Sequence, residues 1–267
     1  MTPRLGRFEY RRSVADRYDE TRAASPSVLR PLRGSLRGAR GRRLADIGGG
    51  TGNYAAALRD LDGFEPLVVD ASPEMLRRAE AKGLVTLQAE ASALPLPDAS
   101  FDAVTLISML HHVPDWRAAM AEARRILRPG GALVYKGFAR DHEEVFWPLR
   151  YFPSSREWFD RTHPSIADTL EELPGAAVEP FEFDDFDDAS LAALSRSPER
   201  VLNAGREGRT SFFGRLRHDA PEELESGLDA LERDIAAGRR PELDPEVLDA
   251  RARVGDALIV CWTKPAR

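Results

Sequence analysis

Three acidic residues lie at or just beyond the ends of short apolar segments that are typical of β-strands. Asp46 is within LADIGGGTG, Asp70 ends PLVVD, and Glu90 comes two residues after LVTLQ. In α/β proteins the carboxyl ends of parallel strands meet at one edge of the sheet, where ligands bind. A carboxylate there can face a positive charge, accept two hydrogen bonds from a ribose diol, or accept one from an amino group. Together the three acids predict a nucleoside ligand with a cationic end.

The glycines that follow Asp46 have a spacing that argues against a pyrophosphate ligand. A dinucleotide fingerprint reads G-x-G-x-x-G. Gly48 and Gly50 begin this pattern, but the place of the third glycine is taken by Asn53. Asp46 would also repel a phosphate. Since each glycine costs about 0.5–1 kcal/mol relative to alanine, we expect the loop backbone to approach a ligand more closely than side chains would permit.

Alternating apolar and helical patterns predict the scaffold that positions these groups. Expected helices cover 54–61, 73–82, 115–127 and 166–173, and expected strands cover 44–47, 66–70, 84–88, 101–107, 132–136, 178–183 and 257–263. Strands joined by single helices require right-handed crossovers and therefore a parallel sheet. The sequence predicts an α/β fold: a doubly wound, mostly parallel seven-stranded sheet with a helical cap.

Pattern changes along the chain predict five stretches. They are an N-terminal helical lid (1–43), a cofactor-binding α/β core (44–137), a substrate-side segment that ends the core (138–188), a helical cap insertion (189–254) and the final strand (255–267). The arginine-rich run 30–43 is typical of a solvated linker before the first strand. The aromatic stretch 138–159 fits either a binding pocket or ordinary core beneath the cap, and 203–217 fits either a lid or a plain amphipathic helix.

The totals restrict the class of protein. A net charge of -6 over 267 residues gives no electrostatic footprint for nucleic acid. Cys261 is the only cysteine, so an internal disulfide is excluded. The N-terminus lacks the apolar core of a signal peptide, and no apolar run approaches the about 18 residues of a membrane span. We expect a cytoplasmic protein with a small-molecule substrate, and its oligomeric state, homo-oligomer included, stays open.

Four ordered motifs resemble the class I S-adenosylmethionine-dependent methyltransferases, in the branch that includes ubiquinone/menaquinone C-methyltransferases and many small-molecule enzymes. They are LADIGGGTG (44–52), VVDASPEML (68–76), AEASALPLPDASFDAVTLISMLHHVPD (89–115) and ARRILRPGGALV (123–134). The resemblance implies a Rossmann-like methyltransferase fold and S-adenosyl-L-methionine as cofactor, with S-adenosyl-L-homocysteine as its product. It implies methyl transfer to an oxygen, nitrogen or carbon of a small apolar or aromatic metabolite, such as a quinone or natural product. Two alternatives stay open: a non-methylating cyclisation or rearrangement on the same fold, and a non-catalytic binding module.

The resemblance also implies roles for individual residues. Asp46 and the glycine loop face the methionine end, Asp70 holds the ribose hydroxyls, and Glu90 accepts from the adenine amine, although aspartate is more usual at that position. Within the α/β core, the residues expected to contact the cofactor are Asp46, Gly48, Gly49, Gly50, Asp70, Ala71, Met75, Glu90, Ala91 and Ser108. Met75 fits a simple core residue equally well.

The segment VADRYDETR (14–22) resembles the N-terminal helix that folds over the cofactor in this family. Tyr18 and Arg22 would then close on the methionine carboxylate. A plain amphipathic helix is the alternative.

Two adjacent histidines, His111 and His112, follow the fourth expected strand and predict a general base near the transferred methyl group. Imidazole titrates near neutrality and can take a proton from an acceptor. Adjacent loop residues point in different directions, so we expect His112 to face the substrate; a histidine that only hydrogen-bonds the loop is the alternative. His142, His163 and His218 stand alone and are expected to be structural or on the surface. No histidine has metal-ligand spacing with a cysteine or carboxylate pair, so no metal site is predicted.

Overall fold

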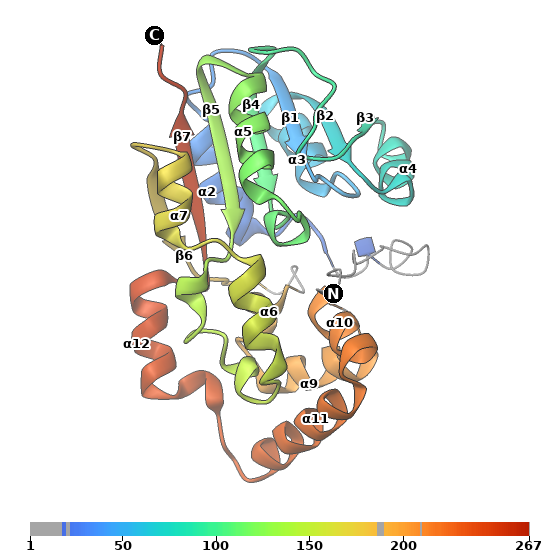
Figure 1. The fold of residues 1–267 in the computed structure, drawn as a ribbon, viewed down its shortest axis with the longest axis vertical. Coiled ribbons are helices and arrows are strands. Elements are labelled where there is room, and N and C mark those ends of the chain that lie inside the picture. The colour runs from blue at the N-terminus through green and yellow to red at the C-terminus, as the bar shows by residue number, and fades with distance from the viewer. Residues whose placement is uncertain (1–17, 20–21, 186–189, 209, 267) are drawn as a thin grey trace, which may run out of the picture.

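The computed structural model describes residues 18–19, 22–185, 190–208 and 210–266. Its centre is a seven-stranded sheet of order β3-β2-β1-β4-β5-β7-β6 (Figure 1). The first five strands pair in parallel, whereas β7 is antiparallel to both β5 and β6. This confirms the predicted doubly wound, mostly parallel seven-stranded sheet. The strands are β1 (Arg43–Ile47), β2 (Glu65–Asp70), β3 (Val85–Gln88), β4 (Phe101–Ile107), β5 (Leu127–Gly137), β6 (Ala177–Phe181) and β7 (Ala257–Thr263).

Helices cover both faces of the sheet. Viewed as in Figure 1, α5 (Trp116–Ile126) and α7 (Ile166–Glu172) lie in front of the sheet, and α2 (Pro26–Leu36) and α3 (Asn53–Asp62) lie behind it. Strand β5 serves both layers because successive side chains alternate between faces. Leu133 and Tyr135 join the core beneath α5, whereas Val134 joins Leu32 of α2 on the other side. The helix α4 (Pro73–Ala81) packs beside α3 at the β2–β3 end of the sheet.

Helix α2 corrects the expectation of a solvated linker at residues 30–43. Its residues Val28, Leu32 and Leu36 are spaced by four and are buried, at 0%, 0% and 2% exposed. This spacing places them on one stripe of the helix, which faces the sheet. The arginines lie between them, and Arg33 makes a two-point pair with Asp62 at 2.7 and 2.9 Å. The arginine-rich run therefore begins inside a packed helix.

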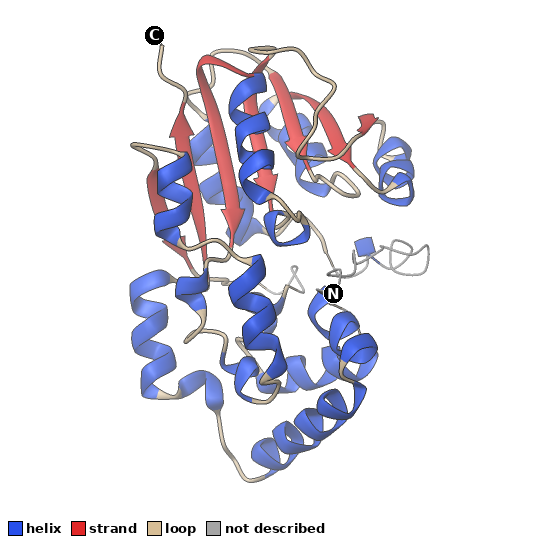
Figure 2. Cartoon of the chain, in the orientation of Figure 1, coloured by secondary structure: helices blue, strands red, loops and turns tan. Residues whose placement is uncertain are grey.

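A layer of helices lies beyond the carboxyl ends of the parallel strands, and Figure 2 shows it without strands. It contains α6 (Ser154–Thr162), α8 (Leu191–Leu194), α9 (Pro198–Glu207), α10 (Ser211–Asp219), α11 (Pro221–Ala236) and α12 (Pro245–Val254), with short 3₁₀ turns η1 (Leu110–His112), η2 (Arg140–His142), η3 (Trp147–Arg150) and η4 (Pro241–Leu243). Helices thus fill most of the described part of 189–254, as the sequence predicts. The division into lid, core and cap stays a prediction. In the described parts of the chain, none of the helices is both long and apolar enough to span a bilayer.

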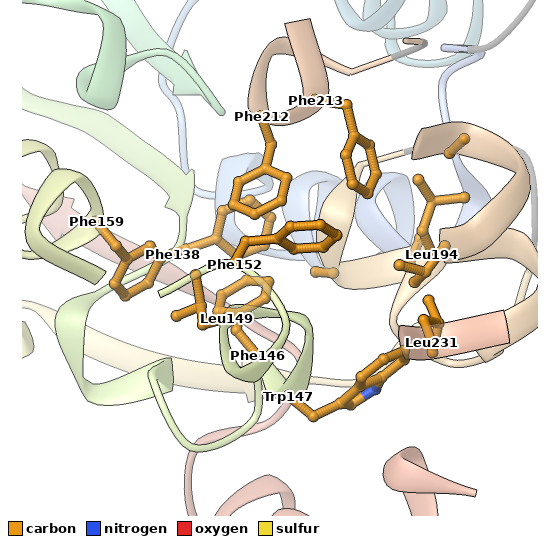
Figure 3. Packing of buried hydrophobic residues seen from close by; sticks show 14 of the residues in the cluster. Phe138, Phe146, Trp147, Leu149, Phe152, Phe159, Leu194, Phe212, Phe213 and Leu231 are labelled. Carbon is orange, nitrogen blue, oxygen red and sulfur yellow. The ribbon is translucent and has the colours of Figure 1, made fainter. Parts of the chain in front are cut away.

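The helical layer has an aromatic core of its own, shown in Figure 3. Phe146, Trp147, Phe152 and Phe213 are at most 2% exposed. The indole Nε1 of Trp147 donates to the carbonyl of Ser195 at 2.7 Å, which satisfies its one polar group. Much of the aromatic stretch 138–159 is therefore core. These buried rings therefore belong to the helical layer that lies beyond the strand ends.

Candidate active site

The glycine loop after β1 is shaped by its backbone and by its packing. Gly48, Gly50 and Gly52 have φ values of +65°, +56° and +72°, a region that favours glycine. A Cβ atom would lie 2.7 Å from Met109 at Gly48 and 2.4 Å from Leu84 at Gly52, but would meet nothing within 4 Å at Gly50. Side chains of the protein itself occupy the space that a Cβ atom would need at Gly48 and Gly52. Among these three glycines, only Gly50 has open space at that position. Internal packing is therefore a further reason for two of these glycines, and the close approach of a ligand to the loop stays a prediction.

Asp46 is buried beneath this loop, with 2% of its surface exposed. Thr105 on β4 donates to its Oδ1 at 2.7 Å, and a Cβ at Gly49 would lie 2.5 Å from its Oδ2. Burial raises the pKa of Asp46 to about 7; the Thr105 hydrogen bond opposes this, and repulsion from Asp70 adds to it. Among the described residues no cation pairs with Asp46. A buried carboxyl in this state favours a positively charged ligand.

Three cavities adjoin at the strand ends. The strand-end cavity has a volume of about 470 Å³, within the roughly 300–1,000 Å³ of ligand sites. Nine residues predicted to contact the cofactor line it: Tyr18, Gly48, Gly50, Asp70, Ala71, Met75, Glu90, Ala91 and Ser108. A smaller loop cavity of about 40 Å³ lies beside it and is lined by Asp46, Gly49 and Arg22. Tyr18, Gly48 and Ser108 line both of these cavities. The predicted cofactor residues thus gather around one connected region.

Asp70 holds the loop and faces the strand-end cavity at once. Its Oδ2 accepts from the Gly50 amide at 3.0 Å and its Oδ1 from the Ser72 amide at 2.8 Å. Burial raises the pKa of Asp70, although these two backbone bonds oppose the rise. Each carboxylate oxygen has a second lone pair, so Asp70 can accept a ribose diol without releasing the loop. Met75 is 3% exposed yet lies on the cavity wall, so it is both core and lining.

The third, aromatic cavity lies between the strand ends and the helical layer, with a volume of about 60 Å³. Phe138, Phe146, Trp158 and Phe159 come from the aromatic stretch, so part of that stretch is pocket wall. Further lining residues are His111, His112, His163, Ser190, Thr210, Ser211 and Phe212. The last three come from the segment 203–217, which places α10 at the rim. Its Phe213 is buried in the core instead.

Three histidines form one wall of the aromatic cavity. The rings of His111 and His163 stack with centroids 5.0 Å apart and planes at 7°, and Phe159 stacks on His163 at 4.2 Å. Burial lowers the pKa of His112 to about 4 and of His163 to about 3, and it lowers the pKa of His111 well below its ordinary value. All three imidazoles are therefore neutral at pH 7. His112 lines both the aromatic and the strand-end cavity, whereas His111 lines only the aromatic one.

The three isolated histidines have different outcomes. His163, expected to be structural or on the surface, is 6% exposed and stacks with His111 and Phe159, and it also lines the aromatic cavity, so a structural role stays a prediction. Its ring arrives from the end of α6, far along the chain, so no local spacing marks it. His142 is buried and bonds Val254 O at 3.1 Å, and His218 is exposed beside Asp219. These two have the structural and surface roles that the sequence predicts.

Ser108 lies where the cavities meet, and it lines all three. It has a φ of +52°, which is uncommon for a residue other than glycine. Its amide donates to Lys136 O at 2.8 Å, and Lys136 Nζ donates to its Oγ at 2.8 Å. Lys136 is 0% exposed. Sequence analysis gave Lys136 only a place in a strand, since nothing in the local pattern marks it.

The segment around Tyr18 docks onto the glycine loop through Asp19, which sequence analysis missed. Thr51 Oγ1 donates to Asp19 at 2.6 Å, and Lys82 Nζ lies 2.9 Å from it. Burial would raise the pKa of Asp19, but these partners together with Asn53 lower it. Arg22 stands over the Tyr18 ring at 5.9 Å. The rest of the predicted N-terminal helix, 14–17 and 20–21, lies outside the described residues.

Comparison with known proteins gives two kinds of match. Residues 45–135 match a protein family described as a methyltransferase domain. The chain is 37% identical over 142 residues to a demethylmenaquinone methyltransferase of Thermus thermophilus, covering 51% of this chain and 62% of that protein. It is 36% identical over 115 residues to the ubiquinone/menaquinone biosynthesis C-methyltransferase UbiE of a Shewanella species, covering 39% and 46%. The chain thus spans less than two thirds of either relative.

Among solved structures, a candidate methyltransferase from an antibiotic biosynthesis pathway of Anabaena variabilis is similar over nearly the whole chain. The TM-score is 0.73 at 25% identity, with 91% of this chain and 98% of that chain covered. The similarity therefore extends beyond residues 45–135 into the helical layer.

Proposed function

Because this chain belongs to the class I S-adenosylmethionine-dependent methyltransferases, we propose that it transfers the methyl group of that cofactor to a small aromatic metabolite. The proposal rests mainly on one observation about the cavities. Tyr18, Ser108 and His112 line both the strand-end cavity and the aromatic cavity. A donor in the first and an acceptor in the second would meet at these residues, as an in-line displacement requires.

The side chains of the strand-end region fit the cofactor. Asp46 offers a buried carboxyl to a positive charge, Asp70 offers two oxygens to a ribose, and Glu90 offers one to an amino group. A pyrophosphate would instead face three acids. Bound S-adenosylmethionine supplies a methyl group already activated on a sulfonium, so the residues of the chain have only to align the acceptor and exclude water. Alignment of this kind contributes up to about 7–11 kcal/mol in favourable cases.

The walls of the aromatic cavity favour a planar, hydroxylated acceptor. Rings of Phe138, Trp158 and Phe212 offer apolar faces, and neutral imidazoles offer lone pairs to an acceptor hydroxyl. Two of the relatives are named for quinone substrates, which have this chemistry. We infer a quinol-like acceptor for this chain. Since the cavity of about 60 Å³ is smaller than a ring system, binding must displace some of the side chains that fill it.

His112 is the group best placed to remove a proton from the acceptor. It lines both cavities, and its pKa of about 4 keeps the ring neutral at pH 7. A neutral imidazole can accept a hydroxyl proton as the new bond to the methyl group forms. His111 stacks on His163, and this stacking would fix the orientation of the His111 ring beside His112.

The proposal is tested by incubating the protein with S-adenosylmethionine and a panel of naphthohydroquinones, substituted phenols and aromatic amines. Chromatography then quantifies S-adenosylhomocysteine, and mass spectrometry quantifies methylated product. We expect equal amounts of both from at least one phenolic member. An acceptor that is consumed without S-adenosylhomocysteine would favour a rearrangement. Cofactor binding with no turnover on any member would favour a binding module, and either result contradicts methyl transfer.

A further inference from the structure

A lysine is buried at the carboxyl end of β5, directly behind the junction of the cavities. Lys136 is 0% exposed, and its Nζ lies 4.6 Å from the ring centroid of Phe138 and 5.4 Å from that of Phe183. Burying an ammonium group is costly compared with burying a hydrocarbon side chain of similar size. A lysine at this position therefore calls for a role that an apolar residue would not perform.

The direction of the hydrogen bond between Lys136 and Ser108 points to such a role. An ammonium group only donates, so Ser108 Oγ must accept from Lys136 Nζ in the 2.8 Å contact between them. The hydroxyl proton of Ser108 must then be donated elsewhere. The position of the Oγ is held, because the Ser108 amide bonds Lys136 O at 2.8 Å, its φ is +52°, and Lys136 Nζ contacts the Oγ itself. The proton then points away from Nζ, and Ser108 lines all three cavities, so an acceptor bound there can receive it.

We propose that Lys136 is a positioning residue that fixes the Ser108 hydroxyl as a donor aimed at an oxygen of the acceptor. The inference rests on the proposed methyltransferase function and adds a basis for choosing the acceptor. A fixed donor backed by an ammonium group favours an atom that carries lone pairs and developing negative charge, such as the oxygen of a phenol or enol. It disfavours an amine, because methylation of an amine creates a positive charge beside Lys136.

The chemical step balances with groups already described. The hydroxyl proton of the acceptor passes to His112, and the electron pair left on the oxygen faces the Ser108 hydroxyl. That oxygen forms the bond to the methyl carbon, or the ring carbon conjugated with it forms the bond; in the second case the proton of that ring carbon passes to water, and the oxygen takes its proton back from His112. The electron pair of the broken carbon–sulfur bond stays on sulfur.

The test compares Lys136→Met, Ser108→Ala and the double variant with a matched control, Lys264→Met. Lys264 Nζ donates to the carbonyls of Arg124 and Leu127 at 2.7 Å and lies outside the three cavities, so its loss reports on a purely structural lysine. With 1,4-naphthohydroquinone as acceptor, Lys136→Met should lower kcat about 10- to 100-fold. S-adenosylhomocysteine affinity should stay within about threefold, because Lys136 does not line the strand-end cavity. The double variant should be no slower than the slower single variant, since both changes remove the same oriented donor.

Three results would overturn the inference: a Lys136→Met kcat within about twofold of the wild type, additive losses in the double variant, or an equal loss on 1-naphthylamine. Wild-type protein that releases no S-adenosylhomocysteine with either acceptor would instead contradict the proposed function itself.

A second measurement needs no acceptor. The groups that face His111 are His112, His163, Arg22 and Lys136, and after burial they lower its pKa. Lys136→Met should therefore raise the titration midpoint of the His111 imidazole in NMR spectra, and an unchanged midpoint would show that the lysine charge does not reach the site.

Discussion

The buried Asp46 should make the affinity for S-adenosylhomocysteine depend on pH near neutrality. Its pKa is about 7, because burial penalises the carboxylate more than the bond from Thr105 favours it, and Asp70 adds repulsion. A ligand ammonium group favours the ionised carboxylate, so ligand binding and loss of the Asp46 proton are linked. The affinity should therefore increase as the pH rises.

The size of the effect follows from the pKa. With a pKa of about 7, roughly one Asp46 in eleven is ionised at pH 6 and roughly ten in eleven at pH 8. The dissociation constant should be about tenfold lower at pH 8 than at pH 6, or about 1.4 kcal/mol in binding free energy. The stability of the ligand-free protein should depend on pH in the opposite direction. Because the folded-state pKa lies above the ordinary aspartate value of 3.8, the contribution of Asp46 to stability is greatest below pH 3.8 and is lost as the pH rises through about 7.

Titration calorimetry at pH 6, 7 and 8, at constant ionic strength, measures this dependence. Asp46→Asn can keep the hydrogen bond from Thr105 but has no proton to release, so the pH dependence should flatten. Asp60→Asn is the matched control, because Asp60 is an exposed acid on α3 that pairs only with Arg59 among the described residues. It should retain the wild-type slope. Equal dissociation constants at pH 6 and pH 8, or an undiminished slope in Asp46→Asn, would refute the placement of a cationic ligand at Asp46.

Further changes separate the two halves of the site. Asp70→Asn should weaken S-adenosylhomocysteine binding about 10- to 100-fold, since a hydrogen bond to a charged group contributes about 1.5–3 kcal/mol; calorimetry that finds no change would remove Asp70 from the ribose site. His112→Ala should lower kcat more than it weakens cofactor binding, with the exposed His218→Ala as control, and wild-type turnover would leave His112 a structural role. Phe212→Ala should raise the KM of the acceptor and leave cofactor affinity unchanged, and a constant KM would place the acceptor elsewhere. Gly50→Ala should lower the melting temperature by an amount equivalent to about 1–2 kcal/mol, because alanine is strained at a φ of +56°, and unfolding scans would check this.

The sheet and the cofactor side of the site were predictable because their signals are local. Apolar runs interrupted by helical patterns place the ends of β1, β2 and β4 at the positions observed, and β7 covers 257–263 as predicted. Parallel strands then bring their carboxyl ends to one edge without further information. Asp70 and Glu90 therefore meet at one cavity even though helix α4 separates them in the sequence.

The features that were missed depend on partners far apart in the chain. Lys136 reaches Ser108 only because β4 and β5 pair in the observed register, and His163 reaches His111 from the end of α6. The early start of β5 also depends on a partner far away in the chain. Pro129-Gly130-Gly131 predicts a break, yet the strand begins at Leu127. Gly130 N donates to Lys264 O at 2.8 Å, and that same residue returns a bond to Gly131, so the segment is held by the chain that leaves β7.

The helical insertion leaves β6 at Phe181 and returns to β7 at Ala257, and these two residues are direct partners in the ladder between the strands. Asp256 fastens the two ends together, since its amide bonds Phe181 O at 2.9 Å and its Oδ2 accepts from Phe183 N at 3.0 Å. In effect the helices from α8 onward are one very long hairpin loop, and lengthening a loop costs free energy only slowly. Changes within that loop would alter the side chains that line the aromatic cavity, while the strands that line the strand-end cavity would keep their register. The acceptor side of the proposed site can therefore vary in sequence without any change to the strands that carry Asp46 and Asp70.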